Sequence, residues 1–420
     1  MNRIRFQPGI QSCSVSLPVS KSIMNRLLVI NFLSGGTDIP GLESEAEDIS
    51  TMQRLLKEIS ENKNKSDNVF ELNTGNAGTV MRFLTAVLAV TPGKWLITGS
   101  ARMQNRPVRP LTDALIQLGA TLIYVSEVGY PPLMITSSTG ISGGVVNLDA
   151  GISSQFISAL MMIGPDLLNG LEIGLQGNII SASYIRMTAE LMRKAGAEVT
   201  FDGNHIRVSK QHYREFIFEQ LSEPDWSAAA FWFEIVALSD NMQVLLTGLT
   251  DLSVQGDSVL PAIFANLGVR SIFLPEGLLI EKSGIPAPDE FDYNFTDCPD
   301  LAQAVIVSCA ALGIKGRFAG LETLRVKETD RIEALRTELN KLGYFVKVEG
   351  NLILLEDKNR PTLSDTETDV INCYDDHRMA MAFAPLALVH NNICVDDPAV
   401  VKKSYPGFWR DISQLGLILE

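Results

Sequence analysis

Charged residues of both signs crowd the start of one predicted helix, in the segment 325-RVKETDR-331. An apolar stripe at spacings of three, four and three residues follows and predicts a helix with one buried face, formed by Ile332, Leu335, Leu339 and Leu342. Gly343 ends this helix, and Asp330 or Thr329 can cap its start. Lys327 and Glu328 therefore lie in the loop or first turn, off the helix N-terminus, where such side chains can line a ligand site.

Cations recur at the starts of other predicted helices, where the helix dipole normally favours acids. The set comprises Lys21, Arg26, Arg82, Arg106, Arg331, Arg378 and Lys403. Each case alone is unremarkable, but together they indicate that helix N-termini and cations converge on bound anions. A unit charge pair at 4 Å contributes about 4 kcal/mol at an effective dielectric near 20, so such a cluster outweighs a diffuse negative surface.

Uncharged donors occupy three further helix starts. The segment 73-NTGNAGT-79 predicts a tight turn that presents backbone N–H groups to an oxyanion, although it lacks the P-loop pattern and does not predict a nucleotide site. Serines begin the apolar helices near 153-SSQF-156 and 181-SASY-184, and helix capping explains them as well as ligand binding does. Ser20 is likewise a candidate cap for a helix that begins near Lys21.

A metal site is not predicted. His377 follows two aspartates in 374-YDDHR-378, but no second histidine lies nearby and the adjacent Arg378 disfavours a cation. The five cysteines form no CxxC pair, which suits a reducing compartment and argues against a disulfide framework or structural zinc.

The bulk composition narrows the class of protein. The chain has 420 residues and a formal net charge of −14, which disfavours a nucleic-acid partner. Its length predicts two domains or one large one. No apolar run reaches the length of a bilayer span, and the segment 1-MNRIRFQPGI-10 has no apolar signal core. We therefore expect a cytoplasmic protein with no membrane partner.

A repeat organises the elements that must position these residues. A periodic helix, then Leu-Gly or Ala-Gly, then a β-rich run recurs at intervals of 72 to 77 residues, at Gly119, Gly196, Gly268, Gly343 and Gly416. The pattern predicts six α/β units of about 70 residues, the first degenerate, in two domains of three. Chain crossings near residues 20 and 222 would give one domain of 20–222 and a discontinuous one of 1–19 plus 223–420.

Seven motifs in this order resemble the 5-enolpyruvylshikimate-3-phosphate synthase family: LPVSKSIMNR, GNAGTVMR, RMQNRP, SSQF, RVKETDR, DDHRMAM and KKSYP. The resemblance spans residues 17 to 408. It implies an α/β (α+β) fold of two similar domains, each of three βαβαββ units in an inside-out α/β barrel, with the active site in the interdomain cleft. The implied reaction is transfer of the enolpyruvyl group of phosphoenolpyruvate to the 5-hydroxyl of shikimate 3-phosphate through a tetrahedral intermediate, which releases phosphate. Neither metal nor organic cofactor is implied, and the family is expected to be monomeric.

The resemblance also assigns roles to residues. It implies Asp300 as the base for the 5-hydroxyl and Glu328 as the proton donor to C3, with Lys21 as a rival donor. The residues implied for shikimate 3-phosphate are Lys21, Ser22, Arg26, Ser153, Ser154, Gln155, Ser181, Tyr184, Asp300, Thr323 and Lys327. Those implied for phosphoenolpyruvate are Lys21, Gly78, Arg106, Gln155, Arg331, Arg378 and Lys403.

Four positions depart from the family pattern. Val19 stands where many relatives have Gly, Phe83 replaces a Pro of well-known members, and Thr323 and Asp375 stand where some have Asn. These departures bear on ligand fit.

Three alternative functions remain. The sister enzyme that acts on UDP-N-acetylglucosamine carries a Cys shortly before the Arg-Pro of its third loop, whereas 101-ARM-103 has no thiol. A non-catalytic small-anion-binding protein would keep the cations without a need for Asp300 and Glu328. An RNA-end-processing enzyme of related fold is disfavoured by the acidic charge.

Overall fold

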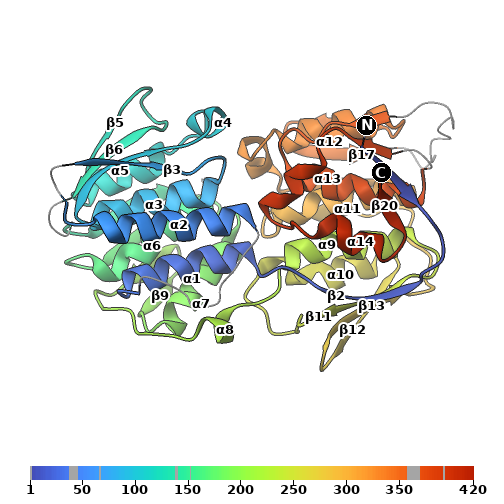
Figure 1. Ribbon diagram of the computed structural model, residues 1–420, viewed down its shortest axis with the longest axis horizontal. Helices are drawn as coiled ribbons and strands as arrows, with labels where there is room; N and C mark the ends of the chain where they lie inside the picture. The colour runs from blue at the N-terminus through green and yellow to red at the C-terminus, as the bar shows by residue number, and fades with distance from the viewer. Residues whose placement is uncertain are drawn as a thin grey trace. The chain divides into compact units, whose positions relative to one another are not determined.

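The chain forms two compact units, identified in a computed structural model that describes residues 2–36, 46–65, 68–137, 141–151, 153–356, 369–390 and 393–420. The continuous unit is Lys21–Ser222, and the discontinuous unit joins Met1–Ser20 to Glu223–Glu420 (Figure 1). The described residues form five four-stranded sheets, two in the continuous unit and three in the discontinuous one.

The two sheets of the continuous unit share one chain path. The first strand lies parallel to the second, and a hairpin then adds the last two strands antiparallel. The first repeat runs β3 (Val69–Asn73), α3 (Gly78–Val90), β4 (Gly93–Thr98), α4 (Ala101–Gln104), α5 (Arg109–Gln117), β5 (Thr121–Tyr124) and β6 (Leu133–Ser137). The second runs β7 (Gly144–Asp149), α6 (Ser154–Ile163), β8 (Leu171–Gln176), α7 (Ala182–Lys194), β9 (Val199–Asp202) and β10 (His205–Val208). This is the predicted βαβαββ order.

The discontinuous unit repeats the same path three times. One repeat is sequential: β14 (Tyr293–Asn294), α11 (Ala302–Leu312), β15 (Gly316–Ala319), α12 (Arg331–Lys341), β16 (Val346–Glu349) and β17 (Leu352–Leu355). A second spans the insertion: β2 (Ser12–Ser16), α9 (Trp226–Leu238), β11 (Gln243–Thr247), α10 (Leu260–Ala265), β12 (Val269–Leu274) and β13 (Gly277–Lys282). The third closes on the chain ends: β18 (Asp369–Ile371), α13 (His377–Phe383), β19 (Ile393–Val395), α14 (Phe408–Ser413), β20 (Leu417–Leu419) and β1 (Asn2–Phe6).

Strand pairing explains why this unit is discontinuous. β2 lies parallel to β11, although the whole continuous unit separates them in sequence. β1 pairs with both β19 and β20 and so completes a sheet with the C-terminal strands. The continuous unit is therefore inserted between the first strand and the first helix of one repeat.

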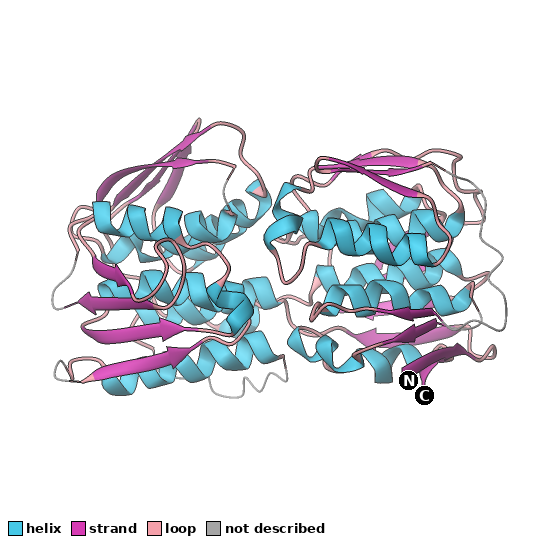
Figure 2. Ribbon diagram, turned by 90° about the horizontal axis from the view of Figure 1, so that it is seen from above, coloured by secondary structure: helices cyan, strands magenta, loops and turns pink. Residues whose placement is uncertain are grey.

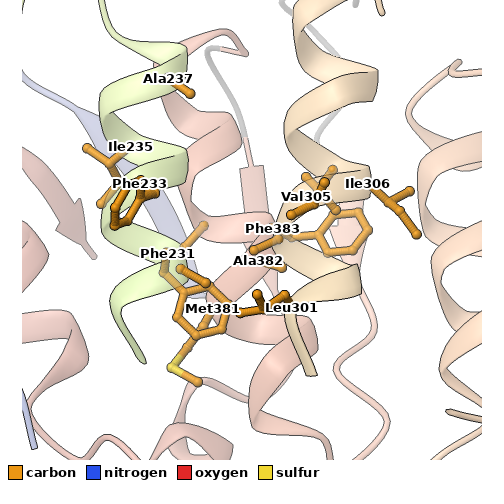
Figure 3. Packing of buried hydrophobic residues seen from close by; sticks show 14 of the residues in the cluster. Phe231, Phe233, Ile235, Ala237, Leu301, Val305, Ile306, Met381, Ala382 and Phe383 are labelled. Atoms are coloured by element: carbon orange, nitrogen blue, oxygen red, sulfur yellow. The ribbon is translucent and has the colours of Figure 1, made fainter. Parts of the chain in front are cut away.

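Within each unit the helices lie inside and the strands outside (Figure 2). The first helix of each repeat is the more buried, because its sequence has no polar face. In α9, 226-WSAAAFWFEIVAL-238, every residue except Ser227 is buried. Phe231 and Phe233 of α9 pack near Val305 of α11 and Phe383 of α13 in this core (Figure 3).

The glycine pattern of the sequence is confirmed. The five repeat glycines have φ of +104°, +87°, +81°, +82° and +82°, a region where a side chain would be strained: Gly119, Gly196, Gly268, Gly343 and Gly416. Each ends the second helix of its repeat and leads into a strand. These residues therefore fix the turn that leads from the second helix of each repeat into the next strand.

Two predictions about helix starts have opposite outcomes. Asp330 does cap α12, since its carboxylate accepts hydrogen bonds from the backbone N–H groups of Ile332 and Glu333 at 3.1 and 3.2 Å. The prediction that Ser20 caps α1 (Lys21–Leu33) is wrong, because the Ser20 hydroxyl has no hydrogen-bond partner among the described residues. Its backbone N–H instead donates to Glu223 O at 2.8 Å, where the chain passes between the units.

The predicted degenerate unit at the start of the continuous unit is only partly described. Residues 21–36 and 46–65 contain α1 and α2 (Glu47–Asn62), and residues 37–45 lie outside the described part. All five cysteines are free thiols. Among the described helices, none is both long and apolar enough to cross a bilayer.

Candidate active site

The predicted site residues form two groups, one in each unit. Most of them lie at or just before the N-terminal end of a helix, after a strand has ended. Free backbone N–H groups and the helix dipole make such ends favourable for anions. The repeat therefore supplies the same kind of position several times, and the residue types decide what each can do.

Arg331 is the centre of the group in the discontinuous unit. It is the first residue of α12, and its side chain is 2% exposed. Its guanidinium binds Asp376 through two hydrogen bonds of 2.6 and 3.2 Å. The same group binds Asp300 Oδ1 at 3.1 Å and Glu328 Oε2 at 3.0 Å. One planar cation thus holds both carboxylates that were predicted to move protons.

Asp300 is held by cations on both of its oxygens. Lys327 Nζ lies 3.5 Å from Oδ1, and Arg378 lies 3.3 Å from Oδ2. Arg378 also donates to the backbone oxygen of Asp300 at 3.0 Å. Asp300 belongs to the short 3-10 helix η3 (Pro299–Leu301) that leads into α11, so its backbone is fixed by the core helix. Three cationic side chains therefore surround the Asp300 carboxylate.

Glu328 bridges two cations from different segments. Its Oε1 lies 2.6 Å from Lys403 Nζ, and its Oε2 is the atom bound by Arg331. Lys403 ends the 3-10 helix η6 (Pro398–Lys403), and both side chains of this pair are 9% exposed. The structure therefore brings Glu328, Arg331 and Lys403 together from positions that lie 75 residues apart in the chain.

Burial and charge shift two of these cations in opposite directions. Burial alone would lower the pKa of Arg331, but the carboxylates of Asp376, Glu328 and Asp300 outweigh it and raise that pKa above its ordinary value. Burial lowers the pKa of Lys327, an effect that Asp300 opposes and Arg331 reinforces. Lys327 therefore releases its proton more readily than an ordinary lysine does.

Asp257 lies against this group and was missed by the sequence reasoning. It is buried in the 3-10 helix η2 (Gly256–Val259), and the Ser227 hydroxyl donates a hydrogen bond to its Oδ2. Burial, together with the charge of Asp300, raises the pKa of Asp257 to about 7. In the sequence it reads as an ordinary acid before a short helix, and no local signal ties it to Asp300.

Thr323 stands apart from the predicted set. It lies in the 3-10 helix η4 (Glu322–Val326), and its hydroxyl has no hydrogen-bond partner within the part of the chain that the structure describes. Two other residues of this unit were predicted to bind shikimate 3-phosphate, namely Asp300 and Lys327. These two do form an ion pair with each other.

Arg26 is the best-fixed cation of the continuous unit. Its Nε donates to Thr188 Oγ1 at 2.6 Å, and its Nη1 donates to the backbone oxygen of Ser22 at 2.7 Å. Its Nη2 donates to Ser158 Oγ at 3.2 Å and to the backbone oxygen of Tyr184 at 3.5 Å. Burial lowers the pKa of Arg26 to about 10, an effect that Tyr184 opposes. All of these acceptors are neutral, so none of them neutralises the positive charge of the guanidinium. That charge can therefore attract an anionic ligand.

Gly78 makes room for two further arginines. It is the first residue of α3, and a Cβ atom there would lie 2.6 Å from Arg106 Nη2 and 2.7 Å from Arg82 Nη1. Arg82 Nη1 donates to the backbone oxygen of Gly78 at 2.9 Å. Both arginines are buried. The structure thus places Gly78 beside Arg106.

Uncharged groups lie at two further helix starts of this unit. Ser153 caps α6 by accepting from the backbone N–H of Gln155 at 3.3 Å, and Ser154 is buried in the first turn. The Gln155 amide donates to Thr79 Oγ1 of α3 at 3.1 Å. Ser181 has a left-handed backbone, φ +57°, immediately before α7. Such a conformation is uncommon for a residue with a side chain and is typical of functional turns.

Lys21 has a carboxylate partner of its own. Its Nζ lies 3.1 Å from Asp48 Oδ2, and the two side chains are 16% and 6% exposed. Lys21 begins α1 and Asp48 lies in the first turn of α2. An acid in a first turn is ordinary for a helix, so no local feature singles out Asp48.

Asp376 was the most important omission of the sequence reasoning. It is 0% exposed, caps α13 by accepting from the backbone N–H of Arg378 at 2.9 Å, and holds Arg331. It lies within the motif 374-YDDHR-378, but neighbouring aspartates cannot be told apart by sequence spacing. Its partner lies 45 residues away.

The chain is similar to one family across nearly its whole length. The family described as EPSP synthase (3-phosphoshikimate 1-carboxyvinyltransferase) matches residues 7–412. The 3-phosphoshikimate 1-carboxyvinyltransferase of Bacteroides fragilis is 44% identical over 417 residues, which cover 99% of this chain and 98% of that protein. The protein of the same name from Shewanella amazonensis is 34% identical over 439 residues, which cover 99% of each chain.

A solved structure confirms the fold class. EPSP synthase from Acinetobacter baumannii is similar with a TM-score of 0.73 at 20% identity, over 100% of this chain and 99% of that one. The predicted α/β fold with repeated βαβαββ units is therefore correct.

Proposed function

The chain belongs to the EPSP synthase (3-phosphoshikimate 1-carboxyvinyltransferase) family, and we propose that it transfers the enolpyruvyl group of phosphoenolpyruvate to the 5-hydroxyl of shikimate 3-phosphate. This is the step toward chorismate in aromatic amino-acid biosynthesis. The observation that supports it most is the Arg331 guanidinium, which holds Asp300 and Glu328 at 3.1 and 3.0 Å. A non-catalytic anion-binding protein has no need for two carboxylates held among its cations.

The proposed addition step moves two protons. The 5-oxygen of the acceptor bonds to C2 of phosphoenolpyruvate, and its proton passes to Asp300. C3 takes a proton from Glu328 in its acid form, or from Lys21 as the alternative donor. Two carboxylates on either side of the reacting atoms can relay both protons, each step being general acid–base catalysis. The product of this step is a tetrahedral intermediate that still carries the phosphate.

The proposed elimination step reverses the proton transfer at C3. The bond from C2 to the phosphate oxygen breaks, C3 returns a proton to the Glu328 carboxylate, and the double bond forms again. Cations that stabilise the charge on the departing phosphate lower this barrier. Arg331, Arg378 and Lys403 are the cations of this unit that we propose for this task, and each contacts Asp300 or Glu328.

We propose that residues of both units bind one pair of substrates. Arg26, Ser22 and the helix starts at Ser154 and Ser181 would hold shikimate 3-phosphate, with Lys327 from the other unit. Gly78, Arg106 and Gln155 would join Arg331, Arg378 and Lys403 on phosphoenolpyruvate. In this proposal residues 20–222 and residues 1–19 plus 223–420 are the two domains of the enzyme.

A phosphate-release assay tests the proposed function. Purified protein should release phosphate from phosphoenolpyruvate only when shikimate 3-phosphate is also present. Release with UDP-N-acetylglucosamine in place of shikimate 3-phosphate would assign the sister activity instead. Binding of both ligands without release would favour a non-catalytic protein.

We also propose that the enzyme is a cytoplasmic monomer that needs neither metal nor organic cofactor. The chemistry supports the proposal that no cofactor is needed, because addition and elimination at phosphoenolpyruvate require proton transfer and charge stabilisation but no redox step. The net charge of −14 disfavours a nucleic-acid partner. Unchanged activity after treatment with a chelator, and elution as a single 46.0 kDa chain, are the expected results.

A further inference from the structure

We propose that Phe83 is a positioning residue for acceptor binding, whose ring, with that of Tyr184, holds the Arg26 guanidinium ready for an anionic group of the acceptor. The inference rests on the proposed function and deepens it. It gives a role to a residue that stands where well-known members of the family carry proline.

The aromatic contacts of Arg26 come from two helices. Arg26 Cζ lies 5.3 Å from the centroid of the Phe83 ring, which belongs to α3 and is 0% exposed. It lies 5.9 Å from the centroid of the Tyr184 ring, which belongs to α7. Both distances fall within the range of about 6 Å over which a ring face attracts a cation. Desolvation strengthens that attraction, and Arg26 is 2% exposed.

The surroundings of Arg26 leave its charge uncompensated. Its hydrogen bonds go to two hydroxyls and two backbone oxygens, and no carboxylate lies within ion-pair distance of it in the described ranges. Nη1 carries two N–H groups but donates to Ser22 O alone among the described residues. A buried cation with a spare donor favours an incoming oxyanion.

Phe83 performs a task that the hydrogen bonds cannot. Thr188, Ser158 and the backbone oxygens fix the edges of the guanidinium plane, whereas a ring contact restrains its face. The ring also excludes water without adding a negative charge that would compete with the ligand. A residue without an aromatic face at position 83 would leave the edges held but would remove the nearer of the two ring contacts.

The test compares Phe83→Leu with Leu88→Ala, a control that opens the core of the same helix at another 0% exposed position. For Phe83→Leu, calorimetry should show about tenfold weaker binding of shikimate 3-phosphate, the loss expected for a desolvated cation–π contact. Its KM for phosphoenolpyruvate should stay within about twofold, because the lost interaction concerns the acceptor alone. Leu88→Ala should lower Tm and leave acceptor affinity unchanged. Phe83→Met, whose flexible side chain adapts to an irregular space, gives the same comparison if the leucine variant is too unstable.

A double-mutant cycle tests whether the ring acts through Arg26. In an Arg26→Lys background, where the planar guanidinium is absent, Phe83→Leu should weaken acceptor binding by less than about threefold. Binding of shikimate, which keeps the carboxylate and lacks the phosphate, identifies the anionic group. A similar loss with shikimate assigns Arg26 to the carboxylate, and a loss confined to shikimate 3-phosphate assigns it to the phosphate.

Three outcomes would overturn the inference. Unchanged affinity of folded Phe83→Leu for both acceptors, with normal turnover by the unsubstituted enzyme, removes the role of Phe83 and leaves the proposed function intact. An equal loss in the Arg26→Lys background would show that the ring does not act through Arg26. Absence of turnover by the unsubstituted enzyme would remove the proposed function and this inference together.

Discussion

The two groups of site residues hold their cations in different ways. In the discontinuous unit, Arg331 and Lys403 are bound to carboxylates, with Asp300, Glu328 and Asp376 as partners. In the continuous unit, Arg26 is bound to hydroxyls and backbone oxygens and lies over two aromatic rings. The same repeat architecture supplies helix starts in both units, so the difference lies in the side chains.

This difference suits the two groups of residues to different tasks, proton transfer and ligand binding. A carboxylate can accept or donate a proton within physiological pH when its surroundings shift its pKa, whereas a hydroxyl or backbone oxygen cannot. The discontinuous unit is therefore equipped for proton transfer. The continuous unit is equipped for affinity, because Arg26 retains an uncompensated charge. Lys21 departs from this division, since it pairs with Asp48 in the continuous unit and remains the rival proton donor.

The largest expected effect tests the proton-transfer assignment. Glu328→Gln keeps the shape and hydrogen-bonding capacity of the side chain but cannot relay a proton. We expect kcat to fall by about 10²-fold or more, while the affinity for shikimate 3-phosphate changes little. Steady-state kinetics and calorimetry measure the two quantities. Glu322→Gln, at an exposed position of the neighbouring 3-10 helix, is the matched control and should keep the full rate.

A wild-type rate in Glu328→Gln would remove that residue from the mechanism. Lys21 would then be the remaining candidate for the proton donor to C3. Proton transfer would no longer be confined to the discontinuous unit.

The second prediction concerns the buried anchor of Arg331. Asp376→Asn removes the charge that faces the guanidinium through two hydrogen bonds. Breaking a buried ion pair by changing one partner costs about 3–5 kcal/mol of unfolding free energy, and Asn, which keeps some hydrogen bonding, should fall at the lower end. We expect kcat/KM for phosphoenolpyruvate to fall by about 30-fold, since Arg331 loses its fixed orientation. Denaturant unfolding and kinetics provide the measurements.

Asp375→Asn is the control for this substitution. Asp375 is exposed and has φ +54°, a conformation that Asn tolerates, so stability should change by less than about 0.5 kcal/mol. Equal losses in both variants would mean that the loop, rather than the ion pair, positions the site.

Much of the fold was readable from the sequence because it repeats. The five glycines with positive φ mark one backbone requirement that only glycine meets without strain, so their spacing exposed the βαβαββ units. The apolar stripe of α12 and its Asp330 cap were likewise local features. Such features depend on residues close together in the chain, which a sequence displays directly.

The missed residues are those whose role depends on distant partners. Asp376 meets Arg331 across 45 positions, and Arg26 meets Thr188 across 162. Asp257 gains its importance from the Asp300 charge beside it, which no spacing indicates. Local rules also misjudged Ser20, because the backbone contact with Glu223 determines the conformation there. Tertiary contacts of this kind can be found from a sequence only through resemblance to a known family.

The third prediction addresses the affinity side of the comparison. Arg26→Lys keeps a positive charge but loses the planar group that binds Thr188, Ser158 and Ser22 at once. We expect KM for shikimate 3-phosphate to rise by about tenfold and kcat to change by less than about threefold. Arg54→Lys, at a side chain 53% exposed on α2, should change neither. A large fall in kcat at saturating acceptor would place Arg26 in the chemical step. It would contradict the assignment of Arg26 to ligand binding alone.

The smallest effect belongs to Asp257, whose pKa is raised to about 7 by burial and by Asp300. An acid with a raised folded-state pKa binds its proton more tightly when folded. Its contribution to stability is therefore complete below the unfolded pKa, near 4, and is lost as pH rises toward about 7. Asp257→Asn mimics the neutral form and still accepts the hydrogen bond from Ser227. The Tm of the unsubstituted protein should fall relative to this variant between pH 4 and pH 7.

Activity should report the same titration. Above pH 7 the ionised Asp257 adds a negative charge beside Asp300, so KM for phosphoenolpyruvate should rise by about twofold in the unsubstituted enzyme and less in Asp257→Asn. Asp251→Asn, at an exposed position in the same unit, is the control and should follow the unsubstituted enzyme throughout. Parallel pH profiles for all three proteins would show that Asp257 keeps one protonation state. The acid–base groups of the discontinuous unit would then be confined to the carboxylates that contact Arg331.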